Sequence, residues 1–284
     1  MTIYNAVGYA LLSLHALVSA FLAPPTLGAT GGLVVGGLYL VFIWLVAGLY
    51  LPEILHMGIA HRALEFKGWF VKSTTLVCNT IGIYVNPRSW VNRHRHHHAF
   101  SDRDGDPNKL GVDGFWKTLY LCLFPYPCQF DMARDPILET WPMRLASSPF
   151  FAVVAQITSY GFLWLLVSDW AYALALWVSV RLIALWTNMV QNYWTHDRRF
   201  GARRYQDDDN AMNIGEWLPV TATFSACLQN NHHHHPQFFR LSHSPAEYDF
   251  GFQAVRLMKR LGLVKPSNTG ARLPAGLELE EVGL

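Results

Sequence analysis

Charged side chains are missing from the first 52 residues, which contain no lysine, arginine, aspartate or glutamate. Over all 284 residues only 15% are charged, whereas a soluble domain carries about 25%. A secretory signal peptide is an alternative for the N-terminus, but such a peptide begins with basic residues and has one short apolar stretch. Here the basic residues are absent and a second apolar stretch follows closely. The scarcity of charge therefore predicts an integral membrane protein.

Cysteine pairs at metal-binding spacing are also missing. The four cysteines, Cys78, Cys122, Cys128 and Cys227, form no CxxC motif. Neither a zinc knuckle nor a disulfide framework is therefore indicated. The formal net charge of +2 is too small to predict nucleic acid as a partner.

Four apolar segments are long enough to cross a bilayer, for which a helix needs roughly 20 residues. They cover residues 4–23, 32–51, 149–167 and 170–193. The last two are joined only by Ser168 and Asp169, so they must form a helical hairpin. Residues 73–85 are too few to span and are expected to form a buried or interfacial helix. The sequence thus predicts an all-α integral membrane protein with four transmembrane helices in two hairpins.

The basic residues predict which side of the membrane each loop faces. The connection at residues 24–31 has no charge, and the one at 168–169 has only Asp169. Every lysine and arginine except Arg181 lies beyond the opposite ends of the spans, and the positive-inside rule places those segments in the cytoplasm. Both termini are then cytoplasmic. We expect a membrane domain with a cytoplasmic helical cap over residues 1–265 and a poorly ordered tail over 266–284.

Arg181 falls in the middle of the fourth predicted span, where a charge is costly. Either its side chain faces a polar cavity, or the fourth helix is placed about one turn too early.

Histidine is abundant and unevenly distributed, since eleven of the thirteen histidines lie in four short clusters. The clusters are His56 and His61; His94, His96, His97 and His98; His196; and His232, His233, His234 and His235. All four lie at or just beyond the predicted cytoplasmic ends of spans. Histidines that merely pack in the core would be expected on both sides of the membrane. His15 and His243 stand apart and are expected to be a helix-packing residue and a surface residue.

The spacing within the clusters predicts shared helix faces. His94, His97 and His98 stand at i, i+3 and i+4, which places three imidazoles on one face. Asn192 and His196 stand at i and i+4 at the end of the fourth span. The first cluster extends the second span as it leaves the bilayer. Taken singly, the HxxxxH spacing is a weak pattern, and each of the two longer histidine runs could equally consist of exposed polar residues without a metal.

The combined clusters indicate a metal centre. Neutral imidazole is a common ligand for iron, copper and zinc. Many imidazoles without a thiolate argue against an iron–sulfur cluster or structural zinc. Eight or more histidines exceed one tetrahedral site, so a two-metal centre is the simpler interpretation. An all-nitrogen site of this kind suits oxygen activation better than structural bracing.

The histidine motifs resemble those of the membrane fatty-acyl desaturase family, in particular its acyl-CoA Δ9-type branch. The family's HxxxxH box is similar to HMGIAH at 56–61, its HxxHH box to HRHHH at 94–98, and its NxxxH element to NYWTH at 192–196. Trp90 and the run SDRDGDP at 101–107 flank the second box as in the family. The resemblance extends over about residues 40–263.

The third box departs from the family pattern H-N-x-H-H-x-x-P, because this chain reads QNNHHHHP at 229–236. Pro236 and the Arg-Leu pair at 240–241 fix the register, so Gln229 occupies the place of a histidine. Glutamine can bind a metal through its carbonyl oxygen, more weakly than imidazole. His234 could compensate if the loop shifts. The alternative register with His234 and His235 as ligands misplaces the proline.

The resemblance implies two ferrous ions and their ligands. The implied ligands are His56, His61, His94, His97, His98, His196, His232 and His233, with Asn192, directly or through a water, and Gln229 as a tenth. Three acidic residues, Asp102, Asp104 and Asp106, either hydrogen-bond the outer nitrogens of the ligands or form an exposed acidic turn.

The activity implied is O2-dependent di-iron desaturation of a fatty-acyl chain carried as a thioester of CoA or acyl carrier protein. No flavin, haem or nucleotide motif is visible. Electrons are therefore expected from a separate ferredoxin, rubredoxin or cytochrome b5 type of protein with its reductase. The basic residues Arg93, Arg95, Lys109, Arg203 and Arg204 could meet phosphates of the acyl head group.

Other functions stay open. The same scaffold can act as an acetylenase, a bifunctional desaturase or a fatty-acyl hydroxylase, because fold does not settle the outcome. A metal-ion transporter from another class should place ionisable residues along its spans. Only His15 and Arg181 do so here, which disfavours transport.

Overall fold

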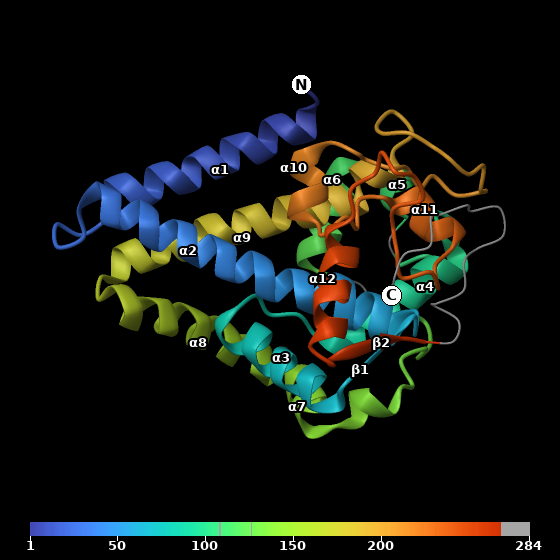
Figure 1. Ribbon diagram of the computed structural model, residues 1–284, viewed down its shortest axis with the longest axis horizontal. Coiled ribbons are helices and arrows are strands. Elements are labelled where there is room, and N and C mark those ends of the chain that lie inside the picture. Colours follow the sequence, from blue (N-terminus) through green and yellow to red (C-terminus); the bar gives the residue numbers. More distant parts are fainter. Residues whose placement is uncertain (108, 126, 268–284) are drawn as a thin grey trace.

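The computed structural model describes residues 1–107, 109–125 and 127–267. Two long helical hairpins extend from a cap of shorter elements, and both hairpin turns lie at the end away from the cap (Figure 1). In chain order the elements are α1 (Ile3–Phe21), α2 (Gly28–Gly48), η1 (Leu49–Ala60), β1 (Leu64–Phe66), α3 (Gly68–Ile81), α4 (Pro87–Phe100), α5 (Leu110–Asp113), α6 (Phe115–Leu123), η2 (Pro136–Glu139), α7 (Trp141–Ala146), α8 (Pro149–Val167), α9 (Trp170–Asn192), η3 (Trp194–His196), α10 (Trp217–Ala222), α11 (Gln229–His234), α12 (Phe250–Arg260) and β2 (Val264–Pro266). The predicted all-α architecture with two hairpins and a helical cap is confirmed.

Four helical segments are long and apolar enough to cross a membrane. They are Ile3–Phe21, Gly28–Ala60, Pro149–Val167 and Trp170–His196. Each overlaps one predicted span. The second is the longest because η1 continues α2 without a break, and the fourth runs on from α9 into η3. These two continuations carry the chain from the apolar region into the cap.

Small residues let the first hairpin close tightly. A Cβ placed on Gly32 or Gly36 of α2 would overlap Ser19 of α1, so only glycine permits this approach. His15 bridges the same helices, with Nδ1 2.8 Å from Ser179 Oγ and Nε2 3.0 Å from the Gly36 carbonyl oxygen. His15 is buried and joins three helices, as expected for a helix-packing residue.

The second hairpin turns over two residues, as predicted. Ser168 adopts a left-handed φ of 55°, which ends α8. The Asp169 carboxylate accepts a hydrogen bond from the Tyr172 backbone N–H and so caps α9. Tyr172 then donates its hydroxyl to the Gly32 carbonyl oxygen, 2.9 Å away, and ties the two hairpins together.

Arg181 lies near the middle of α9, so the predicted helix was not misplaced. Its guanidinium stacks on Trp177 at 3.5 Å and donates to the Ser159 hydroxyl at 2.9 Å, with longer bonds of 3.3 Å to the Tyr39 hydroxyl and the Gly82 carbonyl. Of the two alternatives, the structure supports the one in which Arg181 faces a polar cavity.

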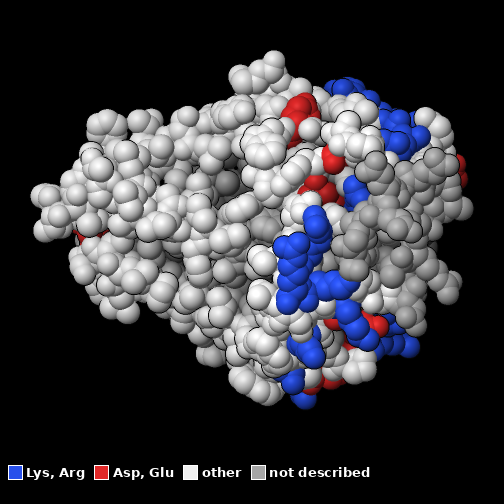
Figure 2. Space-filling model, viewed as in Figure 1, with Lys and Arg blue, Asp and Glu red and all other residues white. Residues whose placement is uncertain are grey.

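Charged side chains gather over the cap, while the end formed by the hairpins is almost bare of them (Figure 2). One predicted boundary differs from the structure. The short helix expected at residues 73–85 is α3 (Gly68–Ile81), which lies against α8. The domain end expected at residue 265 falls within β2, whose Pro266 pairs with Leu64 of β1. The predicted tail beyond Ser267 lies outside the described residues.

Candidate metal centre

A π-helix positions the first two candidate ligands. In an α-helix, residues five apart differ by about 140° around the axis, so His56 and His61 would face apart. In η1 the backbone N–H of His61 instead donates to the His56 carbonyl oxygen, five residues earlier, at 3.0 Å. The two ring centroids consequently lie 4.9 Å apart.

Arg95 fixes the end of this π-helix. Its guanidinium donates to the carbonyl oxygens of Ile59 at 2.6 Å and Ala60 at 3.0 Å, and it pairs with Asp135 at 2.5 Å. Arg95 therefore holds η1 against α4. The expectation that it meets an acyl phosphate is wrong, because its donors are already used within the protein.

Helix α4 supplies three imidazoles from one face, as predicted. The Asn86 side chain caps it by accepting from the Ser89 N–H, and Pro87 occupies the first turn. The three rings nevertheless divide: His94 and His98 turn toward His61, while His97 turns toward a second group. One helix face thus serves two clusters.

Helix α11 divides its histidines in the same way. His232 and His233 are consecutive, so their side chains point to different sides. His232 joins the rings from η1 and α4, and His233 joins His97 and His196. Residues brought together here are up to 176 positions apart in sequence.

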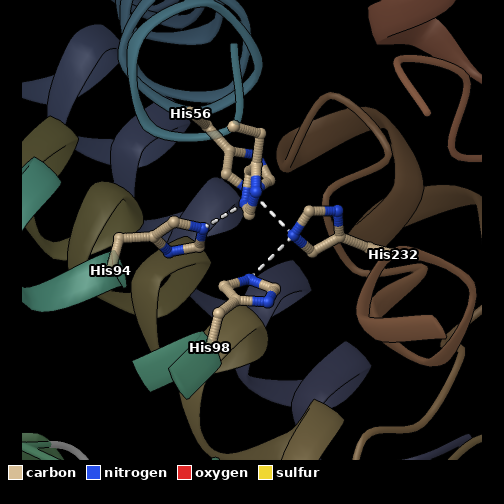
Figure 3. Close-up of side chains that lie close together, drawn as sticks. His56, His94, His98 and His232 are labelled. Carbon is tan, nitrogen blue, oxygen red and sulfur yellow. Dashed lines mark hydrogen bonds between the residues drawn. The ribbon is translucent and has the colours of Figure 1, made fainter. Parts of the chain in front are cut away.

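The five-histidine group consists of His56, His61, His94, His98 and His232, whose candidate ligand atoms all lie within 4.8 Å of one another. Figure 3 shows the imidazoles of His56, His94, His98 and His232 turned toward one another from three helical segments. The Nε2 atom of His232 lies 2.9 Å from that of His56 and 3.0 Å from that of His98. The Nε2 atoms of His61 and His94 are 2.7 Å apart.

The three-histidine group consists of His97, His196 and His233. In each ring Nδ1 faces a carboxylate: Asp106 lies 2.9 Å from His97, Asp102 lies 3.4 Å from His196, and Asp209 lies 2.6 Å from His233. Their opposite nitrogens are left to face one another. This is the arrangement in which a carboxylate orients a metal-binding imidazole.

Burial sets the charge of the imidazoles. It lowers the pKa of His94, His98 and His232 well below the usual range, with neighbouring histidines adding to the effect. These rings are therefore neutral, which is the form that binds a metal. For His97, burial lowers the pKa but the Asp106 carboxylate raises it, and the net direction is upward.

The donor set fits a pair of transition-metal ions. Two nitrogens bound at right angles to one ion at about 2.1 Å lie about 3.0 Å apart, which matches the separations in the five-histidine group. His232 Nδ1 and His233 Nε2 are buried without a hydrogen-bond partner among the described residues, and a buried polar atom of that kind calls for an explanation. A metal at His233 Nε2 supplies one there.

The two non-histidine candidates lie beside the groups rather than within them. Asn192 ends α9 and donates its amide to the Asn188 carbonyl at 2.8 Å. Because η3 is a 3-10 helix, the predicted common α-helical face of Asn192 and His196 is wrong, although both line the same cavity. Gln229 is buried, donates to the Ala226 carbonyl, and also lines that cavity.

Several other expectations need correction. His234 stacks on Tyr205 with centroids 3.9 Å apart and pairs with Asp207, so it does not replace Gln229. Asp104 is exposed and pairs with Lys109 instead of orienting a ligand.

His243 and two arginines also differ from expectation. His243 is only 4% exposed and contacts the Tyr205 hydroxyl at 3.1 Å, so it is not a surface residue. Arg203 donates to backbone carbonyls, Arg204 pairs with Glu247 at 3.6 Å, and neither lines the cavity beside the histidines.

Asp209 was not assigned a role from sequence, although it forms the shortest of the three histidine–carboxylate contacts. The signal available was the Asp209-Asn210 pair, which resembles a family motif, although Asp209 lies 24 positions from His233 in sequence. Only the folded chain brings this pair to α11.

A cavity of about 470 Å³ opens beside both histidine groups, within the range of small-molecule sites. His56, His94, His97 and His196 form part of its wall. The cavity continues between the hairpins along α9 as far as Arg181. A chain-shaped ligand in this space passes directly by the histidines.

Comparisons with known proteins agree with this arrangement. The family model described as fatty acid desaturase matches residues 32–244. The sn-1 stearoyl-lipid 9-desaturase of Anabaena variabilis is 25% identical over 80% of this chain and 81% of its own length. The Delta-9 acyl-lipid desaturase 1 of Arabidopsis thaliana is 25% identical over 83% of this chain and 74% of its own. The sn-2 palmitoyl-lipid 9-desaturase of Nostoc sp. (strain 36) is 24% identical over 81% and 80%.

Proposed function

The chain belongs to the fatty acid desaturase family, and from this premise we propose that its two histidine groups bind two ferrous ions for O2-dependent desaturation of a fatty-acyl chain. That it is a membrane desaturase, an oxidoreductase, follows from the family. The observation that supports the metal proposal is the pair of adjacent imidazole groups on the wall of one elongated cavity. Sites that combine a cavity, metal ligands and perturbed titratable groups are the ones where chemistry occurs.

The proposed ligands are the eight histidines of the two groups. Asn192 and Gln229 complete the set from the cavity side, Asn192 through a water and Gln229 through its free carbonyl oxygen. Bound iron and molecular oxygen supply the oxidising power needed to remove hydrogen from an unactivated methylene.

The protein's own part is to position the ligands and the chain. Asp102, Asp106 and Asp209 orient three rings through their outer nitrogens. Trp90 stacks on His94 with an interplanar angle of 10° and forms part of the cavity wall. The chain's methylenes are then selected by how far the chain enters between the hairpins.

The acyl carrier is proposed from a basic residue in the cavity wall. Of the basic residues expected to meet phosphates, Arg93 alone lines the cavity, and its Nε is buried without a partner among the described residues. A free guanidinium suits the phosphate of a CoA or acyl-carrier thioester. The named relatives act on acyl lipids, so a lipid-linked chain is the alternative carrier.

The cap is proposed to face the cytoplasm, as the positive-inside rule predicts from the basic residues around it. Both termini and the metal centre are then cytoplasmic. Electrons are proposed to come from a soluble or membrane-anchored donor of the ferredoxin, rubredoxin or cytochrome b5 type.

The deciding experiment is product analysis by mass spectrometry after expressing the chain with a ferredoxin system. Acyl-CoA, acyl-carrier and acyl-lipid substrates are supplied in parallel, and we expect a cis-alkene with about two irons per purified chain. A triple bond in the product would identify acetylenase activity, and a hydroxyl group would identify hydroxylase activity. Either product would overturn the proposal of simple desaturation. Variable zinc without oxidation would support a transporter.

Gln229→His tests the unusual position in the third box. If Gln229 contacts a metal, the imidazole changes iron content or turnover. Unchanged iron and unchanged turnover would remove Gln229 from the ligand set. Asn230→Gln is unsuitable as a control because Asn230 holds the 204–205 backbone. His235→Gln, next to α11 and outside both groups, serves instead.

A further inference from the structure

The wall that α9 gives to the cavity is apolar next to Arg181, at Ala184 and Leu185, and polar nearer the histidines. Thr187, Asn188 and Gln191 line it between the histidines and Arg181. The opposite wall from α2 and η1 is apolar, with Ala47, Leu51 and Pro52. Two of the polar groups on α9 already have partners, because the Thr187 hydroxyl donates to the Ala184 carbonyl oxygen at 2.7 Å and Asn188 Oδ1 accepts from the Asn192 amide. The feature of the cavity that a methyl-ended acyl chain leaves unexplained is therefore its distal end.

The distal end of the cavity carries a positive charge. Arg181 lies about 16 Å along α9 from Asn192, at 1.5 Å per residue. Its two terminal nitrogens donate to four neutral acceptors, from Tyr39, Trp177, Gly82 and Ser159. No carboxylate pairs with it among the described residues. The charge at mid-span is therefore hydrogen-bonded without being neutralised.

Two donors at this end stay available to a ligand. Arg181 Nε has no hydrogen-bond partner within the described chain, and neither has the side-chain amide of Gln156 on α8. Both residues line the cavity. An ionisable residue within a membrane span marks a functional site more often than a packing one.

We propose that this distal end binds an oxygen-bearing group at the far end of the acyl chain, with a carboxylate bound more tightly than a hydroxyl. The preferred substrate is then an acyl chain that is oxygenated at its distal terminus. This inference rests on the proposed function, because it takes the cavity as the acyl site. A carboxylate accepts from Arg181 Nε and the Gln156 amide and neutralises the unpaired charge.

The rigid setting of Arg181 gives the selectivity. Contacts from α2, α8, α9 and the residue after α3 hold the guanidinium, and Trp177 stacks beneath it at 3.5 Å. The side chain cannot swing aside to accept a methyl group. A site built to hydrogen-bond a polar group discriminates strongly against the analogue that lacks it.

The test compares acyl chains of equal length that end in a methyl, a hydroxyl or a carboxylate, supplied in competition to the metal-loaded protein in nanodiscs. We expect the oxygenated chains to be turned over at least about tenfold more efficiently by the unaltered protein. Arg181→Met should reduce this ratio to about one. Gln156→Leu should reduce it in part.

Leu182→Ala is the matched control, since Leu182 is 39% exposed and does not line the cavity. A preference for the methyl-ended chain would overturn the proposal. The same ratio in Arg181→Met and Gln156→Leu as in the unaltered protein would also overturn it. Water would then be the occupant of this end of the cavity. Equilibrium binding of the same three chains separates this inference from the proposed function. A binding preference that is lost in Arg181→Met and reduced in Gln156→Leu supports it even if no chain is desaturated.

Discussion

The two histidine groups differ in what orients their rings. Each ring of the three-histidine group is backed by a carboxylate at 2.6–3.4 Å. In the five-histidine group no described carboxylate contacts a ring, and the orientation comes from a π-helix, from α4 and α11, and from stacking on Trp90. One group is oriented by charge and the other by backbone geometry.

This difference has a chemical consequence. A carboxylate on the outer nitrogen makes an imidazole a more basic ligand. Metal ions held by the two groups would therefore experience different ligand fields, even though both sets are imidazoles. The five-histidine group also retains more candidate ligands than the three-histidine group when one histidine is removed.

The largest effect is expected when one histidine is removed from either group, which tests whether the group with fewer histidines loses more metal. Alanine at His97 or His232 should reduce desaturation by more than the 10–100-fold typical of residues that only orient a ligand. His97→Ala leaves two histidines in its group and should lose more iron than His232→Ala, which leaves four. Iron is measured in purified protein, with membrane insertion as the control. If either variant still desaturates an acyl chain at the normal rate, that residue is not a ligand.

A smaller effect tests the role of the carboxylates. Asp106→Asn and Asp209→Asn keep the shape but remove the negative charge beside His97 and His233. We expect a loss of about 10–100-fold in metal affinity at the three-histidine group alone. Metal titration should then show one weakened site and one unchanged site. Equal weakening of both sites would contradict the division of the centre by charge.

His243 belongs to neither group and supplies a reference for pH effects. Burial lowers its pKa to about 3. Because the unfolded histidine binds protons more readily, its contribution to stability is present above a pH of about 6.5 and is lost as the pH falls toward 3. Between pH 7 and pH 5 this loss is about 1–2 kcal/mol.

The measurement compares apparent unfolding temperatures of the apoprotein at those two pH values. The unaltered protein should lose more stability on acidification than His243→Gln, because the other buried histidines contribute equally to both. An identical loss in the two proteins would mean that His243 does not titrate as burial predicts.

The smallest effect is expected at Asp104. This carboxylate is exposed and pairs with Lys109 at the surface, although it lies between two residues that orient ligands. Asp104→Ala should leave iron content, turnover and unfolding temperature unchanged. A loss comparable to that of Asp106→Asn would show that the acidic segment acts as a whole.

Much of the fold could be predicted because hydrophobicity and length determine membrane spans. The four spans and the turn at Ser168 follow from local sequence alone. The histidines, too, were identifiable from their clustering. Their division into two groups was not, because it depends on which way neighbouring rings such as His97 and His98 turn.

Non-local geometry explains the remaining differences. A π-helix has no simple sequence signature, although the five-residue spacing of His56 and His61 matches its hydrogen-bond pattern. His243 is covered by Phe238 and His235 and also by Tyr205 from 38 residues away, and the sequence pattern does not show that these rings converge on it. Asp209 contacts His233 although the two residues are 24 positions apart in sequence, so no pattern of neighbouring residues predicts the contact.

The long sequence separations within the metal centre also constrain its biogenesis. His56 follows the first hairpin, whereas His232 lies beyond the second. During synthesis, the five-histidine group stays incomplete until both hairpins are inserted and the chain has been made past α11. His56, His61, His94 and His98 all precede the second hairpin, so this group would offer four imidazoles to a metal before that hairpin is made, whereas the three-histidine group would offer only His97. Metal at the three-histidine group would therefore mark a chain that has completed its membrane assembly.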